Sequence, residues 1–236
     1  MLRTLSWTVA VLLVAATVLQ FVDQLNLYAQ PPVLPESANM VERRLGTTDY
    51  RAAIWPIFFG SHFLFALALL VVVPLTYVIG ARLPRTEDRR LLMTSTLAGG
   101  ALIGAIGELI LIGAIQPTIG LAYCDCGFKD QEVVSQIWAA MLIEGSYRWL
   151  LNGTALMLGV GFWIAGTLLR GRGMSEAWEW LSRGIAVAFV VPVILSVVET
   201  GEEVSNLLAA LVTGVLVPVW AIWLGRNLGT STVLDA

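Results

Sequence analysis

Six long apolar stretches constrain this chain more than any other feature of its sequence. Crossing the roughly 30 Å hydrocarbon core of a bilayer takes about 20 helical residues. The 236-residue chain is 57% hydrophobic and only 13% charged, whereas soluble domains are nearer a quarter charged, so one soluble core is not expected to bury its apolar residues. The predicted spans are about 5–25, 53–81, 91–115, 137–169, 185–198 and 204–224.

The continuity of these stretches predicts an all-α fold, in which residues 1–236 form a single transmembrane domain built as a bundle of six helices. A membrane β-barrel would show short segments of alternating hydrophobicity instead. Two longer loops, residues 30–51 and 116–132, are predicted on the outer side. The segment 131–170 is about 60 Å long if it is one helix, so it has to tilt, kink near Gly145 or Gly153, or project beyond the bilayer.

The distribution of basic residues predicts the orientation. Nine arginines flank the spans on the side of the two termini: Arg3, Arg82, Arg85, Arg89, Arg90, Arg170, Arg172, Arg183 and Arg226. Four basic residues lie on the other side: Arg43, Arg44, Arg51 and Lys129. The positive-inside rule therefore predicts cytoplasmic termini and a multi-pass protein of the cytoplasmic membrane. Residues 1–29 have a second interpretation as a cleaved signal peptide, because an arginine precedes the apolar run and Leu27-Tyr28-Ala29 resembles a cleavage site.

Ionisable residues embedded in the spans lie at a similar depth. Counted from the arginine of the same span, they lie 16 to 26 residues away, which is roughly 24 to 39 Å of helix. The members of this layer are Asp23, His62, Glu108, Glu144, Arg148, Glu199, Glu202 and Glu203. Asp23, Glu202 and Glu203 border polar loops and are interpreted as markers of the outer interface. Apolar chain continues beyond several of the others, and such a charge has to be paired, neutralised or turned toward the bundle interior.

We therefore predict a polar site that binds a ligand or a proton, formed by Glu108, Glu144, Arg148, Glu199 and His62. Glu144 and Arg148 are spaced i, i+4 and share a helix face. They form either a local ion pair that fixes packing or part of a pocket in which Arg148 is shared with Glu108 or Glu199. One arginine cannot neutralise three carboxylates, which favours a bound cation or an exchanged proton.

His62 is the only histidine and is either a hydrogen-bonded packing residue or a ligand. A zinc or manganese site built from His62 and the carboxylates is chemically possible. The sequence has no HExxH motif and no clustered histidines, so no metal and no cofactor is predicted. Cys124 and Cys126, in the second outer loop, form a disulfide, remain as free or externally paired thiols, or have a redox or metal role.

Glycines predict how two of the spans pack. Gly100, Gly104 and Gly107 are spaced as small residues at helix interfaces are, and they favour close packing of the third span on the fourth. That packing would bring Glu108 toward Glu144 and Arg148. Residues 174–182 (MSEAWEWLS) are predicted as a short amphipathic turn at the inner interface.

The overall layout resembles a known family. Ile143-Glu144-Gly145 in the fourth span, the glycine-rich stretch after it and the short basic loop before the fifth span resemble the bacterial membrane family called domain of unknown function 4386. The resemblance covers most of the chain, but the Cys124-Asp125-Cys126 loop and the acidic turn from Glu199 to Glu203 depart from it. It implies a bacterial membrane location and a helical fold, and it implies no activity.

Three function classes remain open. The first is binding or transport of a cation, a proton or a small cationic amphiphile in an outward-facing acidic cavity. The second is an accessory or structural subunit whose buried charges are paired internally or by a partner membrane subunit, and the third is an intramembrane enzyme using His62 and the carboxylates. A net charge of −3 without a basic cluster argues against a nucleic-acid partner, and the lipid bilayer is the expected partner.

Overall fold

The computed structural model describes residues 1–29, 54–84, 88–122, 131–197 and 208–228. Its named elements are all helices: α1 (Leu2–Ala29), α3 (Trp55–Ala81), α4 (Asp88–Ala122), α5 (Gln131–Leu169), α6 (Glu176–Val197), the π-helical turn η1 (Val212–Leu216) and α8 (Val217–Asn227). Within the described ranges the chain forms no strand, which confirms the all-α prediction.

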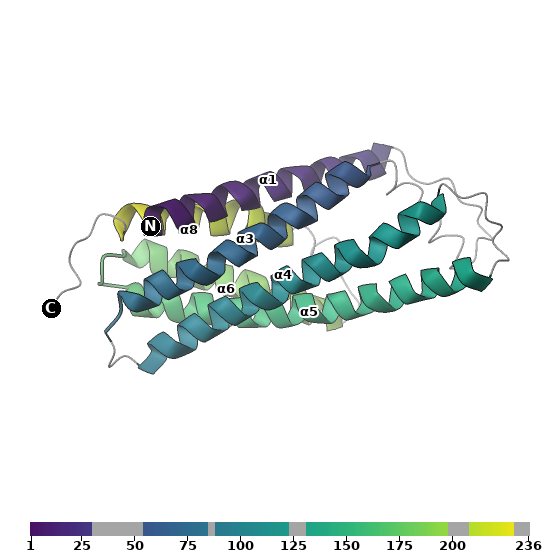
Figure 1. The fold of residues 1–236 in the computed structure, drawn as a ribbon. Helices are drawn as coiled ribbons and strands as arrows, with labels where there is room; N and C mark the ends of the chain where they lie inside the picture. Colours follow the sequence, from purple (N-terminus) through teal and green to yellow (C-terminus); the bar gives the residue numbers. More distant parts are fainter. Residues whose placement is uncertain (30–53, 85–87, 123–130, 198–207, 229–236) are drawn as a thin grey trace.

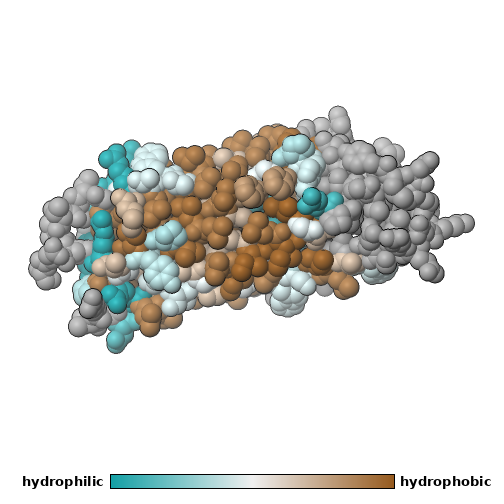
Figure 2. Space-filling view, in the orientation of Figure 1, coloured by the Kyte–Doolittle hydropathy of each residue, from teal (hydrophilic) through white to brown (hydrophobic). Residues whose placement is uncertain are grey.

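Six helical segments are long and apolar enough to cross a membrane: Leu2–Leu25, Trp55–Ala81, Asp88–Gln116, Met141–Leu169, Glu176–Leu195 and Leu208–Asn227. Their outward faces are apolar as well. On α1, exposed apolar side chains recur every three or four residues, at Val11, Val14, Val18, Phe21 and Leu25. Figure 2 shows a broad apolar area across the middle of the face in view. An apolar exterior of this extent suits lipid and not water, so the fold indicates a multi-pass membrane protein.

The helices lie side by side in an elongated bundle (Figure 1). α3 packs between α1 and α4, α5 packs between α4 and α6, and α8 packs on α1. α1 begins and α8 ends at the same end of the bundle. We call this the arginine end, because Arg3, Arg82, Arg90, Arg170 and Arg226 lie at the helix termini there. The opposite end is called the far end.

Glycines of α4 allow a close approach to α5. A Cβ atom built on Gly100 would lie 3.0 Å from Met157 Cβ, and one built on Gly104 would lie 2.9 Å from Thr154 Cγ2. Helices approach this closely where one of them lacks a side chain. The predicted close packing of the third span on the fourth is therefore confirmed. α5 itself is one helix of 39 residues, which neither Gly145 nor Gly153 interrupts.

Residues 176–182 form the first turns of α6 and are not a separate turn at the interface. Trp178, Glu179 and Ser182 are each 2% exposed or less. Trp220 Nε1 on α8 donates a hydrogen bond to Ser182 Oγ at 2.8 Å, and the indole rings of Trp178 and Trp220 stack with centroids 5.2 Å apart. The buried face of this segment therefore joins α6 to α8, while Glu176 and Trp180 are exposed. The segment is amphipathic as predicted, but the prediction of a separate turn was wrong, because most of it belongs to α6.

The acidic residue in this segment is neutralised within the protein. Arg170 Nη1 lies 3.0 Å from Glu179 Oε2, and Arg183 Nη2 lies 2.5 Å from Glu179 Oε1. The turn that follows Arg170 contains Gly171 and Gly173 with φ of 73° and 92°, a left-handed conformation that favours glycine. Because the turn is this tight, the chain reverses directly into α6 and Arg170 faces Glu179.

The last span contacts α1 through two glycines. A Cβ built on Gly214 would lie 2.6 Å from Thr17 Cγ2, and one built on Gly225 would lie 2.9 Å from Ser6 Cβ. Gly214 belongs to η1, which ends just before Pro218. Proline has no N–H for the helical ladder, and the wider π-turn stands where that ladder is interrupted.

Candidate functional site

Glu108 is a deeply buried carboxylate in the far half of α4. Its residue is 2% exposed, and the chain continues beyond it with Leu109, Ile110, Leu111 and Ile112. A carboxylate in such surroundings is stable only if it is neutral or has polar partners. The sequence predicted that Glu108 needs partners, and the structure identifies two of them.

The partners come from the two neighbouring helices. His62 Nδ1 on α3 lies 2.5 Å from Glu108 Oε2, and the Tyr147 hydroxyl on α5 donates a hydrogen bond to Glu108 Oε1 at 2.8 Å. Each carboxylate oxygen thus has its own protein partner. We call these three side chains the Glu108 cluster.

A glycine gives the tyrosine access to the carboxylate. A Cβ built on Gly107 would lie 3.6 Å from Tyr147 Cδ2 and 3.5 Å from Leu150 Cβ, so the phenol ring packs directly over this position. With a larger residue there, α5 would have to stand farther from α4. Gly107 is thus the local reason why a side chain of α5 reaches Glu108.

Apolar side chains cover the cluster on its far-end side. Phe58, Leu111 and Ile115 form a buried group, against which Trp55 and Tyr147 pack. Phe58 precedes His62 by one helical turn, and the centroids of the two rings are 4.4 Å apart. Hydrogen bonds and charge pairs in such a water-poor setting are stronger than at a surface.

The geometry of the Glu108 cluster suits the binding of a proton. At 2.5 Å, His62 and Glu108 are close enough to share one proton, so the pair is neutral overall with that proton and carries one negative charge without it. Histidine and glutamate are the side chains most used for proton transfer near neutral pH. Among the described residues, no group of three or more histidine, cysteine, aspartate or glutamate side chains is arranged to hold a metal ion.

The other predicted site residues fall into two groups. Arg148 has an exposed side chain on α5, and the two hydrogen bonds that Glu108 is seen to make go to His62 and Tyr147. The side chain of Glu144 and the residues Glu199, Cys124 and Cys126 lie outside the described part of the structure, as do Glu202 and Glu203. A pocket that includes Glu144 or Glu199, and a disulfide between Cys124 and Cys126, stay predictions.

Sequence reasoning overlooked Tyr147. It is the only tyrosine in the predicted fourth span, and the polar end of a buried tyrosine usually has a hydrogen-bond partner. That signal, together with the glycines of the third span, would have directed attention to it. The Glu179 pairing was also missed, although Glu179 and Arg183 have the same i, i+4 spacing as Glu144 and Arg148.

No family model, curated protein or solved structure matches this chain. The resemblance to the family of domain of unknown function 4386 therefore stays a prediction.

Proposed function

We propose that this protein is a transport-type protein of a bacterial cytoplasmic membrane, with both termini in the cytoplasm, in which the Glu108 cluster takes up and releases a proton. One observation carries the proposal: a carboxylate 2% exposed lies between apolar helices and contacts a histidine at 2.5 Å. Ionisable residues inside membrane helices are costly, and they commonly mark ion pathways or proton relays. The arginine distribution supports the orientation.

A proton fits this site better than the other ligands that the sequence suggested. Glu108 already has a protein partner at each oxygen, and among the described residues no group of three or more histidine, cysteine, aspartate or glutamate side chains could hold a metal ion beside it. A cationic amphiphile needs an apolar space beside the carboxylate, whereas the far-end side of the cluster is filled by Phe58, Leu111 and Ile115. A proton needs neither a set of metal ligands nor an apolar space, because it can lie between His62 Nδ1 and Glu108 Oε2, which are already 2.5 Å apart.

Proton flux into proteoliposomes tests the proposal. Vesicles that contain a pH-sensitive dye and potassium are given an inside-negative potential with valinomycin, and internal acidification is followed. Wild-type protein is expected to acidify the lumen faster than protein-free vesicles, and Glu108→Gln to reduce the rate to that background. Glu176→Gln is the matched control, because Glu176 has a 65% exposed side chain at the arginine end, and it should retain the wild-type rate. Equal rates for wild type and Glu108→Gln would contradict the proposal.

The completeness of the hydrogen bonding favours a second candidate, a structural subunit. Both oxygens of Glu108 are satisfied within one chain, as in a polar contact that fixes the packing of α3, α4 and α5. In that case Glu108→Gln would lower thermal stability in detergent without changing any flux. A variant that keeps wild-type stability and loses proton flux would favour transport.

A further inference from the structure

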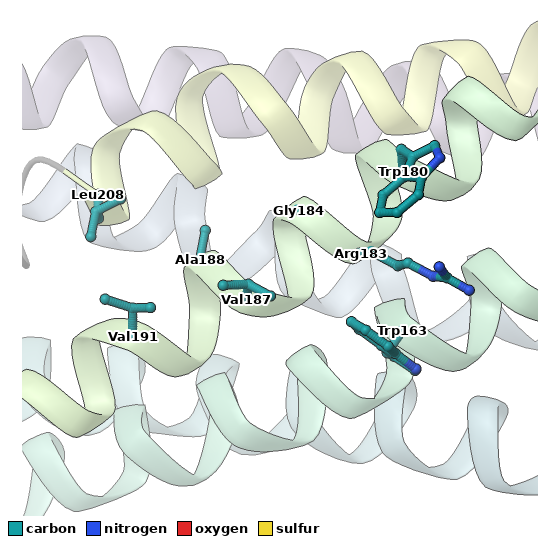
Figure 3. A pocket seen from close by; sticks show the side chains of 8 residues that line it. All are labelled: Trp163, Trp180, Arg183, Gly184, Val187, Ala188, Val191 and Leu208. Atoms are coloured by element: carbon teal, nitrogen blue, oxygen red, sulfur yellow. The ribbon is translucent and has the colours of Figure 1, made fainter.

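A groove opens on the side of the bundle where α6 meets the last span. Its volume is about 520 Å³, within the range of roughly 300–1,000 Å³ that is typical of ligand sites. Figure 3 shows Trp163, Trp180 and Arg183 at one end, and Val191 and Leu208 at the other. α6 and α8 are held together at the arginine end by Trp178 and Trp220. Along α6, the groove lies beyond this contact, on the side away from the arginine end.

The mouth of the groove is a stack of one arginine and two tryptophans. The guanidinium carbon of Arg183 lies 5.1 Å from the ring centroid of Trp163 and 5.2 Å from that of Trp180. Both tryptophans remain exposed, at 46% and 61%. Tryptophan and arginine side chains are characteristic of the headgroup level of a bilayer. The mouth therefore has the composition of a membrane interface.

The rest of the groove is apolar and runs along α6, away from the arginine end. Beyond Gly184, its lining is Val187, Ala188, Val191 and Leu208. Arg183 and Val191 are eight residues apart, which is about 12 Å along the helix axis. A groove with a cationic mouth and an apolar lining of this length matches a molecule with an anionic head and a hydrocarbon tail.

The charge around the mouth favours an anionic partner. Among the described residues of the arginine end there are eight arginines and three carboxylates, those of Asp88, Glu176 and Glu179. Arg183 uses Nη2 on Glu179, and its side chain stays 27% exposed. A guanidinium group has five N–H donors, so this partly exposed side chain has further donors for a phosphate oxygen.

We propose that this groove binds an anionic glycerophospholipid, with one acyl chain along α6 and the phosphate at the Arg183 mouth. The proposal requires only that the bundle spans a bilayer, and it does not depend on proton exchange at Glu108. Basic pockets between membrane helices bind the headgroups of anionic lipids, and an apolar cleft beside such a pocket can hold an acyl chain.

Gly184 offers a direct test of chain binding. A Cβ built on Gly184 has no atom within 4 Å, so leucine fits there and fills the groove. The full-length protein in detergent is titrated with phosphatidylglycerol, or with phosphatidylcholine of the same acyl chains, and bound lipid is counted by native mass spectrometry. Gly184→Leu is expected to weaken phosphatidylglycerol binding by at least about tenfold. Gly113→Leu on α4 is the control, because its Cβ position is equally open, and its binding should be unchanged.

Arg183→Gln tests the headgroup contact. Wild type is expected to prefer phosphatidylglycerol over phosphatidylcholine, and Arg183→Gln to lose that preference while Glu176→Gln retains it. Thermal unfolding of each variant confirms that it is folded. Unchanged binding in Gly184→Leu would overturn the proposal, and so would equal binding of the two lipids by wild type. A second protein that copurifies in an amount equal to this chain and excludes lipid from the groove would also overturn it. Proton flux is expected to be unchanged in Gly184→Leu, which separates this test from that of Glu108.

Discussion

The imidazole Nδ1 of His62 lies 2.5 Å from Oε2 of Glu108, although the two residues are 46 positions apart in the chain. At this distance the imidazole and the carboxylate are hydrogen-bond partners. The contact therefore ties α3 to α4 within the bundle. One pair of side chains is thus relevant both to chemistry and to stability.

Removing the carboxylate of Glu108 is expected to destabilise the bundle. Glu108→Ala leaves His62 and the Tyr147 hydroxyl without their partner and opens a cavity, at a cost of about 2–4 kcal/mol in the free energy of unfolding. Thermal unfolding in detergent measures the change. Glu176→Ala, at a largely exposed position, should stay within about 0.5 kcal/mol of wild type. Similar losses for the two variants would contradict the assigned role of the cluster.

Tyr147→Phe removes one hydroxyl and leaves the ring in place over Gly107. The hydrogen bond to Glu108 Oε1 at 2.8 Å is lost, and we expect a decrease of about 1.5–3 kcal/mol if the acceptor is ionised. Tyr77→Phe makes the same change at a side chain that is 61% exposed, with an expected effect below about 0.5 kcal/mol. Chemical unfolding of both variants in mixed micelles gives the comparison.

Two glycine-to-alanine changes should have opposite signs. At Gly104 the new methyl group would lie 2.8 Å from Leu69 Cδ1 on α3 and 2.9 Å from Thr154 Cγ2 on α5, so these side chains or the helices have to shift, at a cost of about 1–3 kcal/mol. At Gly153 nothing lies within 4 Å, and alanine should stabilise the helix by about 0.5–1 kcal/mol. Melting temperatures measured side by side test this, and a stabilising Gly104→Ala would show that the two helices are less closely packed.

Two glutamates of α6, one turn apart, should differ strongly. Glu179 is buried between Arg170 and Arg183, and Glu179→Ala is expected to cost about 1.5–3 kcal/mol because it removes charged hydrogen bonds to both arginines. Glu176 lies 3.8 Å from Arg170 on the surface, where such a pair contributes at most about 1 kcal/mol. Unfolding measured at low and high salt distinguishes them further, since only the Glu176 pair is expected to be screened.

Helix rise and periodicity explain which parts of this fold were predictable. The six helices and the similar depth of His62 and Glu108 follow from the apolar runs and from a constant rise per residue. The direction in which a side chain points around the helix axis depends on tertiary packing and could not be counted in the same way. The prediction therefore considered Arg148 as a partner of Glu108, whereas the hydroxyl that reaches Glu108 belongs to Tyr147, about 100° away on the same helix.

Residues 174–182 show the other limit of sequence reasoning. The mixture of charged and aromatic residues predicted a short amphipathic turn at the inner interface, and charged residues are rarely buried unless they are paired. The pairing that reverses this expectation uses Arg170, which a glycine turn brings back onto α6. Trp220 contributes from α8, more than forty residues away. Such long-range partners leave no local pattern in the chain.

The packing of α1 against the last span has a consequence for biosynthesis. Thr17 and Ser6 meet Gly214 and Gly225, so one side of the first helix is completed only by the last one. During translation, this small-residue face of α1 stays open until about two hundred further residues have been synthesised. A nascent chain arrested before residue 208 is therefore expected still to present that face.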